Sequence, residues 1–323
     1  MKDELLKKVS EIAKEGKEKL PKWLLPEALS EAEAEMNETR YVKLVKESKV
    51  PVYTLLKTMF DEDKVLFLPR VLSTTIRTLN RIPRTLFMKA SPQREQYIFD
   101  TFKTWSSAIC KLVQVRLKIV GADKIDPAGT YLFASNHRSP ADIPLLYESL
   151  PVKAAFVANG IVGRIPIFSY WMKASGAVFV EQGNPKAEEA AFKAMIKRLR
   201  HGRNLILFPE GYIHQGAGVG EFKRGGLHAA LLANVPIVPV CLSNTEKVMR
   251  AGSLYIAPRQ NVTVEFGEPI VPATMSRKEK KYIDFTLRAE IAAMKEKAAG
   301  KNPTPLSIEE LRDALRAEIN KLA

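Results

Sequence analysis

The first third of the chain has the hydrophobic spacing of helices. Apolar residues recur every three to four positions over residues 5–13, with lysines and glutamates between them. Pro21 and Pro26 end this helix, and a further helix with an apolar stripe is predicted over residues 93–115. We therefore predict a helical N-terminal region over residues 1–116, built of membrane-interface helices or bundle helices.

One segment of this region is both basic and amphipathic. No acid interrupts its bases, which are Lys64, Arg70, Arg77, Arg81, Arg84 and Lys89. On a helical wheel the arginines lie opposite an apolar side formed by Leu72, Ile76, Leu79, Leu86 and Phe87, and Pro83 kinks or divides the element. Two interpretations stay open: the segment lies in a bilayer interface, or it is a bundle helix with a solvated basic face.

At about residue 117 the pattern changes to short apolar runs that alternate with helical stretches. Strands are predicted over 117–120, 130–134, 154–158, 177–180, 205–208, 237–242 and 261–267. Helices are predicted between them over 142–148, 185–200 and 226–233. This alternation predicts an α/β domain over residues 117–275, a mostly parallel sheet flanked by helices. Residues 276–323 are predicted to form charged C-terminal helices, divided at 300–305.

Composition and charge narrow the possible cellular location and partners of the protein. The 323 residues are 46% hydrophobic, which is enough for a sizeable core, and the two cysteines favour a reducing compartment. The charged N-terminus lacks the apolar core of a signal peptide, and no apolar run is long enough to span a membrane. A net charge of +14 without a nucleic-acid-binding signature favours an anionic membrane surface as partner, and no nucleic acid. We predict a cytoplasmic protein, peripheral at the inner face of a membrane.

The candidate chemistry centres on His137 and Asp142, within the sequence Asn-His-Arg-Ser-Pro-Ala-Asp that starts at Asn136. This block follows a predicted strand and precedes a helix, where open α/β sheets bind ligands. A carboxylate five residues after a histidine lies within one turn and accepts one ring N–H, which leaves the other ring nitrogen as a base. A structural interpretation also exists, because the stretch from Ser139 to Asp142 has the form of a helix capping box with Pro140 at the first helical position.

Two later blocks add polar groups. The apolar strand over 205–208 ends in Pro209-Glu210-Gly211, and a buried acid needs a partner that offsets its desolvation. Lys223 and Arg224 precede a glycine pair and a helix start, which suits an anion. Each block alone has a plainer explanation: an exposed Glu210 in a turn, and a charged loop before a helix. The scattered histidines predict no metal site, and the sequence predicts no bound cofactor.

Together these blocks resemble the glycerolipid acyltransferase family over residues 117–245. The match comprises Asn136, His137 and Asp142, then Phe208 to Gly211, Phe222 to Gly225, and Val235 to Val240. The resemblance implies an O-acyltransferase that moves an acyl group from acyl-CoA or acyl carrier protein to a hydroxyl of a lysophospholipid such as 1-acylglycerol-3-phosphate. It implies that His137 is the general base and that Asp142 orients it.

The resemblance also implies substrate-binding roles. Asn136, Glu210 and Gly211 would position the acceptor, and Lys223 and Arg224 would hold an anionic headgroup or the phosphates of the donor. Two family arginines associated with the acceptor's phosphate are replaced here by Glu181 and by Tyr212-Ile213. Candidate substitutes are Lys173, His214, Lys223 and Arg224. Alternatives are therefore another lysophospholipid or a non-phosphate acceptor, water as acceptor in a thioesterase, or a non-catalytic membrane-binding module of the same fold.

Overall fold

The core of the protein is a single seven-stranded sheet. The computed structural model describes residues 67–300 and 312–313, apart from residues 80, 82, 83, 86, 90, 165, 217 and 254. Its strands are β1 (Arg116–Val120), β2 (Leu132–Ser135), β3 (Ala154–Asn159), β4 (Val178–Val180), β5 (Asn204–Leu207), β6 (Ile237–Ser243) and β7 (Asn261–Phe266). They are ordered β1-β7-β6-β2-β5-β3-β4, and every neighbouring pair is parallel except β6 and β7. The predicted α/β fold class is confirmed.

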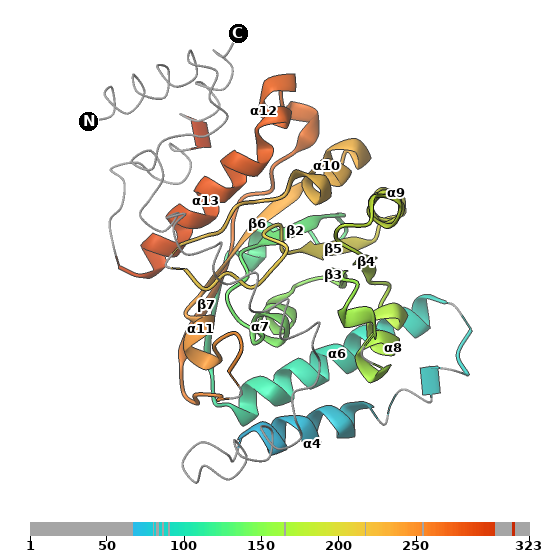
Figure 1. The fold of residues 1–323 in the computed structure, drawn as a ribbon, viewed down its shortest axis with the longest axis vertical. Helices are drawn as coiled ribbons and strands as arrows, with labels where there is room; N and C mark the ends of the chain where they lie inside the picture. The colour runs from blue at the N-terminus through green and yellow to red at the C-terminus, as the bar shows by residue number, and fades with distance from the viewer. Residues whose placement is uncertain are drawn as a thin grey trace.

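Helices cover both faces of this sheet (Figure 1). One face packs against α9 (Pro185–Arg200), α10 (Arg224–Ala233) and α13 (Ile283–Ala298). The other packs against α6 (Pro92–Leu112), α7 (Asp142–Ser149) and α8 (Pro166–Ala174), and α4 (Phe67–Leu79) lies outside α6. Along β2 the side chains alternate between these layers, since Leu132 and Ala134 face the first layer and Phe133 faces the second. The central strand is therefore buried on both sides, as parallel sheets require.

Local capping explains why some elements have the bounds that the sequence predicts. The α9 helix spans the predicted residues because the Asn184 side chain accepts the Ala187 N–H and Pro185 occupies the first turn. The C-terminus of α7 is capped differently, by the Lys103 ammonium of α6, which donates to the carbonyls of Tyr147, Glu148 and Leu150. Predictions about residues 1–66, Pro83, Leu86 and a helix after residue 305 lie outside the described residues.

The segment after residue 275 is a layer of the core. The structure adds a break to the predicted first helix, because α12 (Arg277–Lys281) and α13 divide at Tyr282. The α13 helix ends at Ala298, and the predicted division at 301–305 lies outside the described residues. Ile283, Leu287 and Ile291 of α13 are fully buried against the sheet. The charges of α13 are paired in this setting: Arg288 Nε donates to the Val219 carbonyl, and Glu290 forms an ion pair with Arg312. Whether the three predicted units are independent domains stays a prediction.

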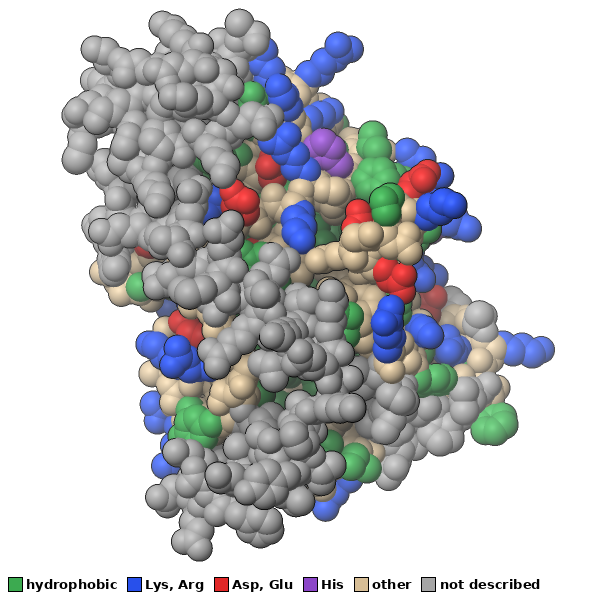
Figure 2. Space-filling model, viewed as in Figure 1, with side chains coloured by type: hydrophobic (Ala, Val, Ile, Leu, Met, Phe, Trp, Pro, Cys, Tyr) green, Lys and Arg blue, Asp and Glu red, His purple; other side chains and the backbone are tan. Residues whose placement is uncertain are grey.

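Basic side chains dominate the described part of the face seen in Figure 2, and they gather over α12 at its upper end. The sequence of α12 is Arg-Lys-Glu-Lys-Lys, and its one acid, Glu279, is buried in a capping box with Ser276. The excess of positive charge is therefore displayed at the surface, where it attracts anionic partners. Among the described helices, none has the length and apolar character of a membrane span.

Candidate active site

The loop with His137 and the loop with Glu210 meet at one edge of the sheet. They follow β2 and β5, which are adjacent and parallel, so their carboxyl ends lie together. The His137 Nδ1 atom lies 2.7 Å from Asp142 Oδ2, which is hydrogen-bond distance. The Asp142 carboxylate is the only hydrogen-bond partner of this ring among the described residues. The Nε2 atom is therefore left to act as a base, and the His137 side chain is 13% exposed.

Asp142 is held by the backbone as well as by His137. Its side chain is fully buried, and the same Oδ2 atom accepts the N–H groups of Arg138 (2.6 Å) and Ser139 (2.8 Å). The predicted capping box needs correction, because α7 begins at Asp142 and not at Pro140. The Ser139 hydroxyl accepts the Ala141 N–H and donates to the Met249 carbonyl, so it does not cap the third helical residue. Asp142 thus fixes the loop and His137 at once.

An aromatic contact that the sequence did not predict orients the His137 ring. The Phe208 ring stacks on it, with centroids 4.0 Å apart and planes 14° from parallel. Phe208 in turn stacks on Phe156, whose ring contacts Tyr147 of α7. The stack joins the residues that follow β2 and β5 to the middle of β3. The only sequence signal was the position of Phe208, directly before Pro209-Glu210, at the end of an apolar strand.

The Asn136 side chain is engaged within the protein, and its predicted role in substrate binding stays a prediction. It is fully buried, and its amide exchanges two hydrogen bonds with the backbone of Leu242 in β6, at 2.9 and 2.8 Å. Both polar groups of the amide are therefore used within the protein. They fix the start of the His137 loop to the neighbouring strand.

Glu210 is the buried acid of the first interpretation of its motif. Its side chain is fully buried, so it is not an exposed turn residue, and both oxygens accept backbone N–H groups. Oε1 accepts from His137 (2.9 Å) and Oε2 from Gly220 (3.1 Å). Burial raises the pKa of Glu210 to about 7, and the two N–H donors together with Arg138 and Lys295 limit the rise. Glu210 therefore holds the His137 loop to the segment around Gly220 through hydrogen bonds to both.

This raised pKa makes a testable contribution to stability. Between its ordinary pKa of 4.5 and about 7, Glu210 holds a proton in the folded state that the unfolded chain releases, so its contribution to the free energy of unfolding falls as pH rises. The buried His214, whose pKa is lowered to about 4 by burial and by Arg138, Lys295 and Arg288, acts in the opposite direction up to its ordinary 6.5. A profile of the free energy of unfolding against pH therefore contains the contributions of both Glu210 and His214. The difference in this free energy between wild type and Glu210→Gln isolates the contribution of Glu210.

We expect the stability of wild type relative to Glu210→Gln to be lower at pH 8 than at pH 5, by about 1 to 3 kcal/mol, as urea unfolding would measure. The exposed Glu189, whose pKa is lowered by a hydrogen bond from Lys193, provides the control: Glu189→Gln should give a small change of the opposite sign. An equal difference at both pH values would mean that Glu210 is already ionised in the folded protein at pH 5.

The remaining predicted residues lie beside Glu210. Gly211 has φ +77°, and a side chain there would meet the Gln182 amide and the Lys223 ammonium. The Lys223 Nζ atom lies 3.4 Å from Gln182 Oε1. The Arg224 side chain forms an ion pair with Asp284 of α13, to which its Nε donates at 2.9 Å. Lys223 thus stays near the site, whereas Arg224 ties the start of α10 to α13.

These contacts define a class of site. A buried carboxylate orients a histidine at the carboxyl ends of parallel strands, and no side-chain hydroxyl or thiol among the described residues hydrogen-bonds its ring. A serine or cysteine nucleophile would need such a bond to be activated. The geometry fits general-base chemistry on a group that a substrate brings.

Comparison with known proteins agrees with this class. Residues 116–243 match the family model named Acyltransferase. The chain is 29% identical over 180 residues to the chloroplastic 1-acyl-sn-glycerol-3-phosphate acyltransferase LPAT1 of Arabidopsis thaliana, covering 55% of this chain and 50% of that protein. It is 24% identical over 194 residues to the 1-acyl-sn-glycerol-3-phosphate acyltransferase of Salmonella typhimurium, covering 59% of this chain and 78% of that protein.

The fold has a counterpart among solved structures. The crystal structure of the 1-acyl-sn-glycerophosphate acyltransferase PlsC from Thermotoga maritima matches with a TM-score of 0.59 and 21% identity, over 71% of this chain and 95% of that one. Residues 116–243 therefore resemble acyltransferases in sequence, and the fold is similar to that of a solved member of this group. The match spans about half the length of the plant relative.

Proposed function

We propose that this protein is an O-acyltransferase that acylates a lysoglycerophospholipid. The observation that carries the proposal is the His137–Asp142 pair, with one ring nitrogen bonded to a buried carboxylate and the other without a partner among the described residues. The named relatives are 1-acyl-sn-glycerol-3-phosphate acyltransferases, which supports the same chemistry here. The donor is acyl-CoA or acyl carrier protein, as a co-substrate.

The reaction follows from the arrangement of this pair. The Nε2 atom of His137 removes the proton of the acceptor hydroxyl as its oxygen attacks the thioester carbonyl carbon. The carbon–oxygen ester bond forms, the carbon–sulfur bond breaks, and the imidazolium returns its proton to the departing thiolate. Asp142 stabilises the transient positive charge on the ring through the Nδ1–H bond. Phe208 keeps the ring plane fixed while this happens. No acyl-enzyme is formed.

The acceptor we propose first is lysophosphatidate, because the named relatives act on 1-acylglycerol-3-phosphate. A second candidate is a different lysophospholipid or an uncharged alcohol. It is favoured by Glu181, which stands where the family has an arginine and lies 3.7 Å from Arg164 in an exposed pair. Such a pair leaves little net positive charge for a phosphate at this position.

The test is thiol release from acyl-CoA with a panel of acceptors: lysophosphatidate, lysophosphatidylcholine, lysophosphatidylethanolamine and monoacylglycerol. Stimulation by lysophosphatidate above the others is the expected result. Stimulation by other acceptors alone would retain the acyltransferase and exclude the phosphomonoester acceptor. Release without an acylated product on thin-layer chromatography would indicate a thioesterase. No release from acyl-CoA or acyl carrier protein would favour a non-catalytic module.

The membrane is the partner that we propose for α4. Val71, Thr74, Thr75 and Thr78 are half-buried, and Trp105 of α6 donates its indole N–H to the Thr75 hydroxyl. The predicted apolar side is not used for this packing, since Leu72 and Ile76 are 57% and 49% exposed. Exposed apolar side chains next to exposed arginines suit the interface of an anionic bilayer, the inner face of the cytoplasmic membrane in our proposal.

Reversal of Arg77, Arg81 and Arg84 to glutamate should release the protein from anionic vesicles in flotation. Each basic residue near such a surface contributes about 1 kcal/mol, so three reversals remove several kcal/mol of binding. The matched control reverses Lys186, Lys193 and Lys197 on α9, which lies on the opposite face of the sheet from α4. This control changes the net charge of the protein by the same amount. Equal flotation of both triple variants would show that α4 is only a surface helix of the bundle.

A further inference from the structure

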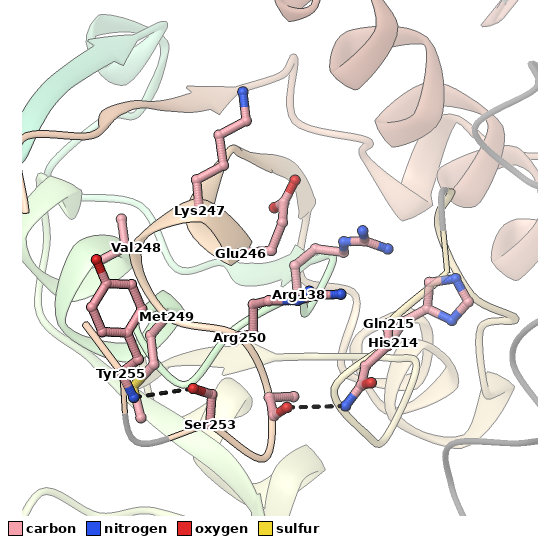
Figure 3. Close-up of a pocket in the computed structure, with 11 residues that line it drawn as sticks. Arg138, His214, Gln215, Glu246, Lys247, Val248, Met249, Arg250, Ser253 and Tyr255 are labelled. Atoms are coloured by element: carbon pink, nitrogen blue, oxygen red, sulfur yellow. Dashed lines mark hydrogen bonds between the residues drawn. The ribbon is translucent and has the colours of Figure 1, made fainter. Parts of the chain in front are cut away.

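A polar cavity of about 450 Å³ adjoins the His137 loop. Three segments that are distant in sequence form it: Arg138, residues 214–215 after β5, and residues 246–251, 253 and 255, which include most of α11 (Thr245–Val248) (Figure 3). Hydrogen bonds join the lining of this cavity to the loop that carries His137. The His214 N–H donates to the His137 carbonyl at 2.8 Å, and the Ser139 hydroxyl donates to the Met249 carbonyl at 2.6 Å. The cavity therefore has a fixed position relative to the site.

Its lining carries an excess of positive charge. Arg138, Lys247 and Arg250 face one acid, Glu246. Lys247 and Arg250 are exposed, and neither side chain has a hydrogen bond or ion pair among the described residues. In Figure 3 the guanidinium of Arg138 extends toward the His214 ring. A cation-rich cavity that is open at one side and buried at the other selects for an anionic ligand.

Three residues of the cavity have buried side-chain atoms without hydrogen-bond partners, namely His214, Arg138 and, at its Oε2 atom, Glu246. His214 is 1% exposed, and neither of its ring nitrogens has a hydrogen bond. Arg138 is 7% exposed; its Nη1 donates to the carbonyls of Gly216 and Gly218, but its Nε has no partner. Buried donors without partners cost free energy that a ligand oxygen would offset. The free donors point to oxygen atoms as the missing partners.

The charge around His214 agrees with this ligand. Burial and the positive charges of Arg138, Lys295 and Arg288 lower its pKa to about 4, so the ring is neutral at pH 7 and has one N–H to donate. An anion in the cavity would relieve the positive field that Arg138 and its neighbours create.

We propose that this cavity is a phosphate subsite, in which Arg138, His214 and Arg250 hold a phosphoryl group. As part of the proposed acyltransferase, it takes the place of the family arginines that are replaced here by Glu181 and by Tyr212-Ile213. In a lysophosphatidate only two carbons and an ester oxygen separate the phosphorus from the reacting hydroxyl oxygen. A phosphate site beside His137 therefore suits the acceptor headgroup. The donor's phosphates share the same chemistry and are the other source.

The variants for the test are Arg250→Gln and the double variant Lys247→Gln/Arg250→Gln, because both side chains are exposed and their loss leaves the fold intact. Arg116→Gln, at an exposed position on the edge strand β1, is the matched control. Binding of inorganic phosphate to the full chain by calorimetry gives a readout that needs no catalysis. We expect the double variant to bind phosphate about 10- to 100-fold more weakly, as loss of charge-assisted hydrogen bonds predicts, and the control to bind as wild type.

Kinetics then identify the source of the phosphate. A KM for lysophosphatidate that rises at least tenfold in Arg250→Gln, with unchanged values for monoacylglycerol and acyl-CoA, assigns the subsite to the acceptor. A rise for acyl-CoA alone assigns it to the donor. Equal phosphate binding and equal KM values for Arg250→Gln and Arg116→Gln would overturn the subsite. Weakened phosphate binding in a protein that transfers no acyl group would retain the subsite and overturn the proposed function.

Discussion

Replacement of His137 by alanine should lower kcat for acyl transfer by about 10²- to 10⁴-fold, the range that general-base catalysis contributes. His137 is the one residue whose ring combines an unengaged Nε2 with a buried carboxylate on Nδ1. No neighbouring hydroxyl or thiol in the described part of the chain hydrogen-bonds this ring to form an alternative nucleophile. The effect should fall on kcat more than on KM, because the base acts in the transition state.

The measurement is the rate of thiol release with a saturating acceptor, together with the midpoint of thermal unfolding. His201→Ala is the matched control, since His201 is exposed at the end of α9 and bonds only to the Lys197 carbonyl. A His137→Ala protein that folds normally and keeps more than about one tenth of the wild-type kcat would place the base elsewhere, because general-base catalysis contributes more than that.

Asp142→Asn should lower kcat by about 100-fold or more while the protein stays folded. The asparagine oxygen can occupy the position of Oδ2 and accept from the N–H groups of Arg138 and Ser139 and from His137. Its amide nitrogen then lies where Oδ1 already has no partner, so no hydrogen bond is lost. What is lost is the negative charge that stabilises the imidazolium and that the N-terminus of α7 favours.

Asp142→Ala is the informative comparison, because it removes the acceptor of two buried backbone N–H groups as well as the charge. We expect it to lower the free energy of unfolding by about 2 to 4 kcal/mol, measured in urea, with a similar or greater loss of kcat. If Asp142→Asn has the wild-type kcat and only Asp142→Ala is impaired, then Asp142 serves the loop and the start of α7, and the structural interpretation of the block is sufficient.

Some contacts of the candidate site could be predicted from the sequence and others could not, and the physical reason differs from residue to residue. The contact between His137 and Asp142 follows from a five-residue spacing across one turn, which a sequence shows directly. The contacts of Asn136 and Glu210 do not follow from spacing along the sequence. Asn136 bonds to Leu242, over a hundred residues away, and Glu210 is buried only because β5 lies beside β2. In the structure the side chains of both residues hold the His137 loop in place.

The cavity beside His137 was even harder to predict from the sequence. Arg138 lies inside the first motif but was assigned no role there, His214 was one of several candidate substitutes, and residues 246–255 had no recognisable pattern. These three segments meet only after the carboxyl ends of β2, β5 and β6 are placed side by side. A pocket formed by such distant segments cannot be inferred from spacing.

The sequence by itself determined the alternation of strands and helices, the order of the motifs and the bounds of α9, because periodicity and capping act over a few residues. Only the tertiary structure decided the strand order, the antiparallel pairing of β7 with β6, and the burial of α13. Arg288 and Glu290 made α13 resemble a solvated helix. Their partners, Val219 and Arg312, lie far along the chain, and only the fold supplies the contacts that offset the desolvation of those charges.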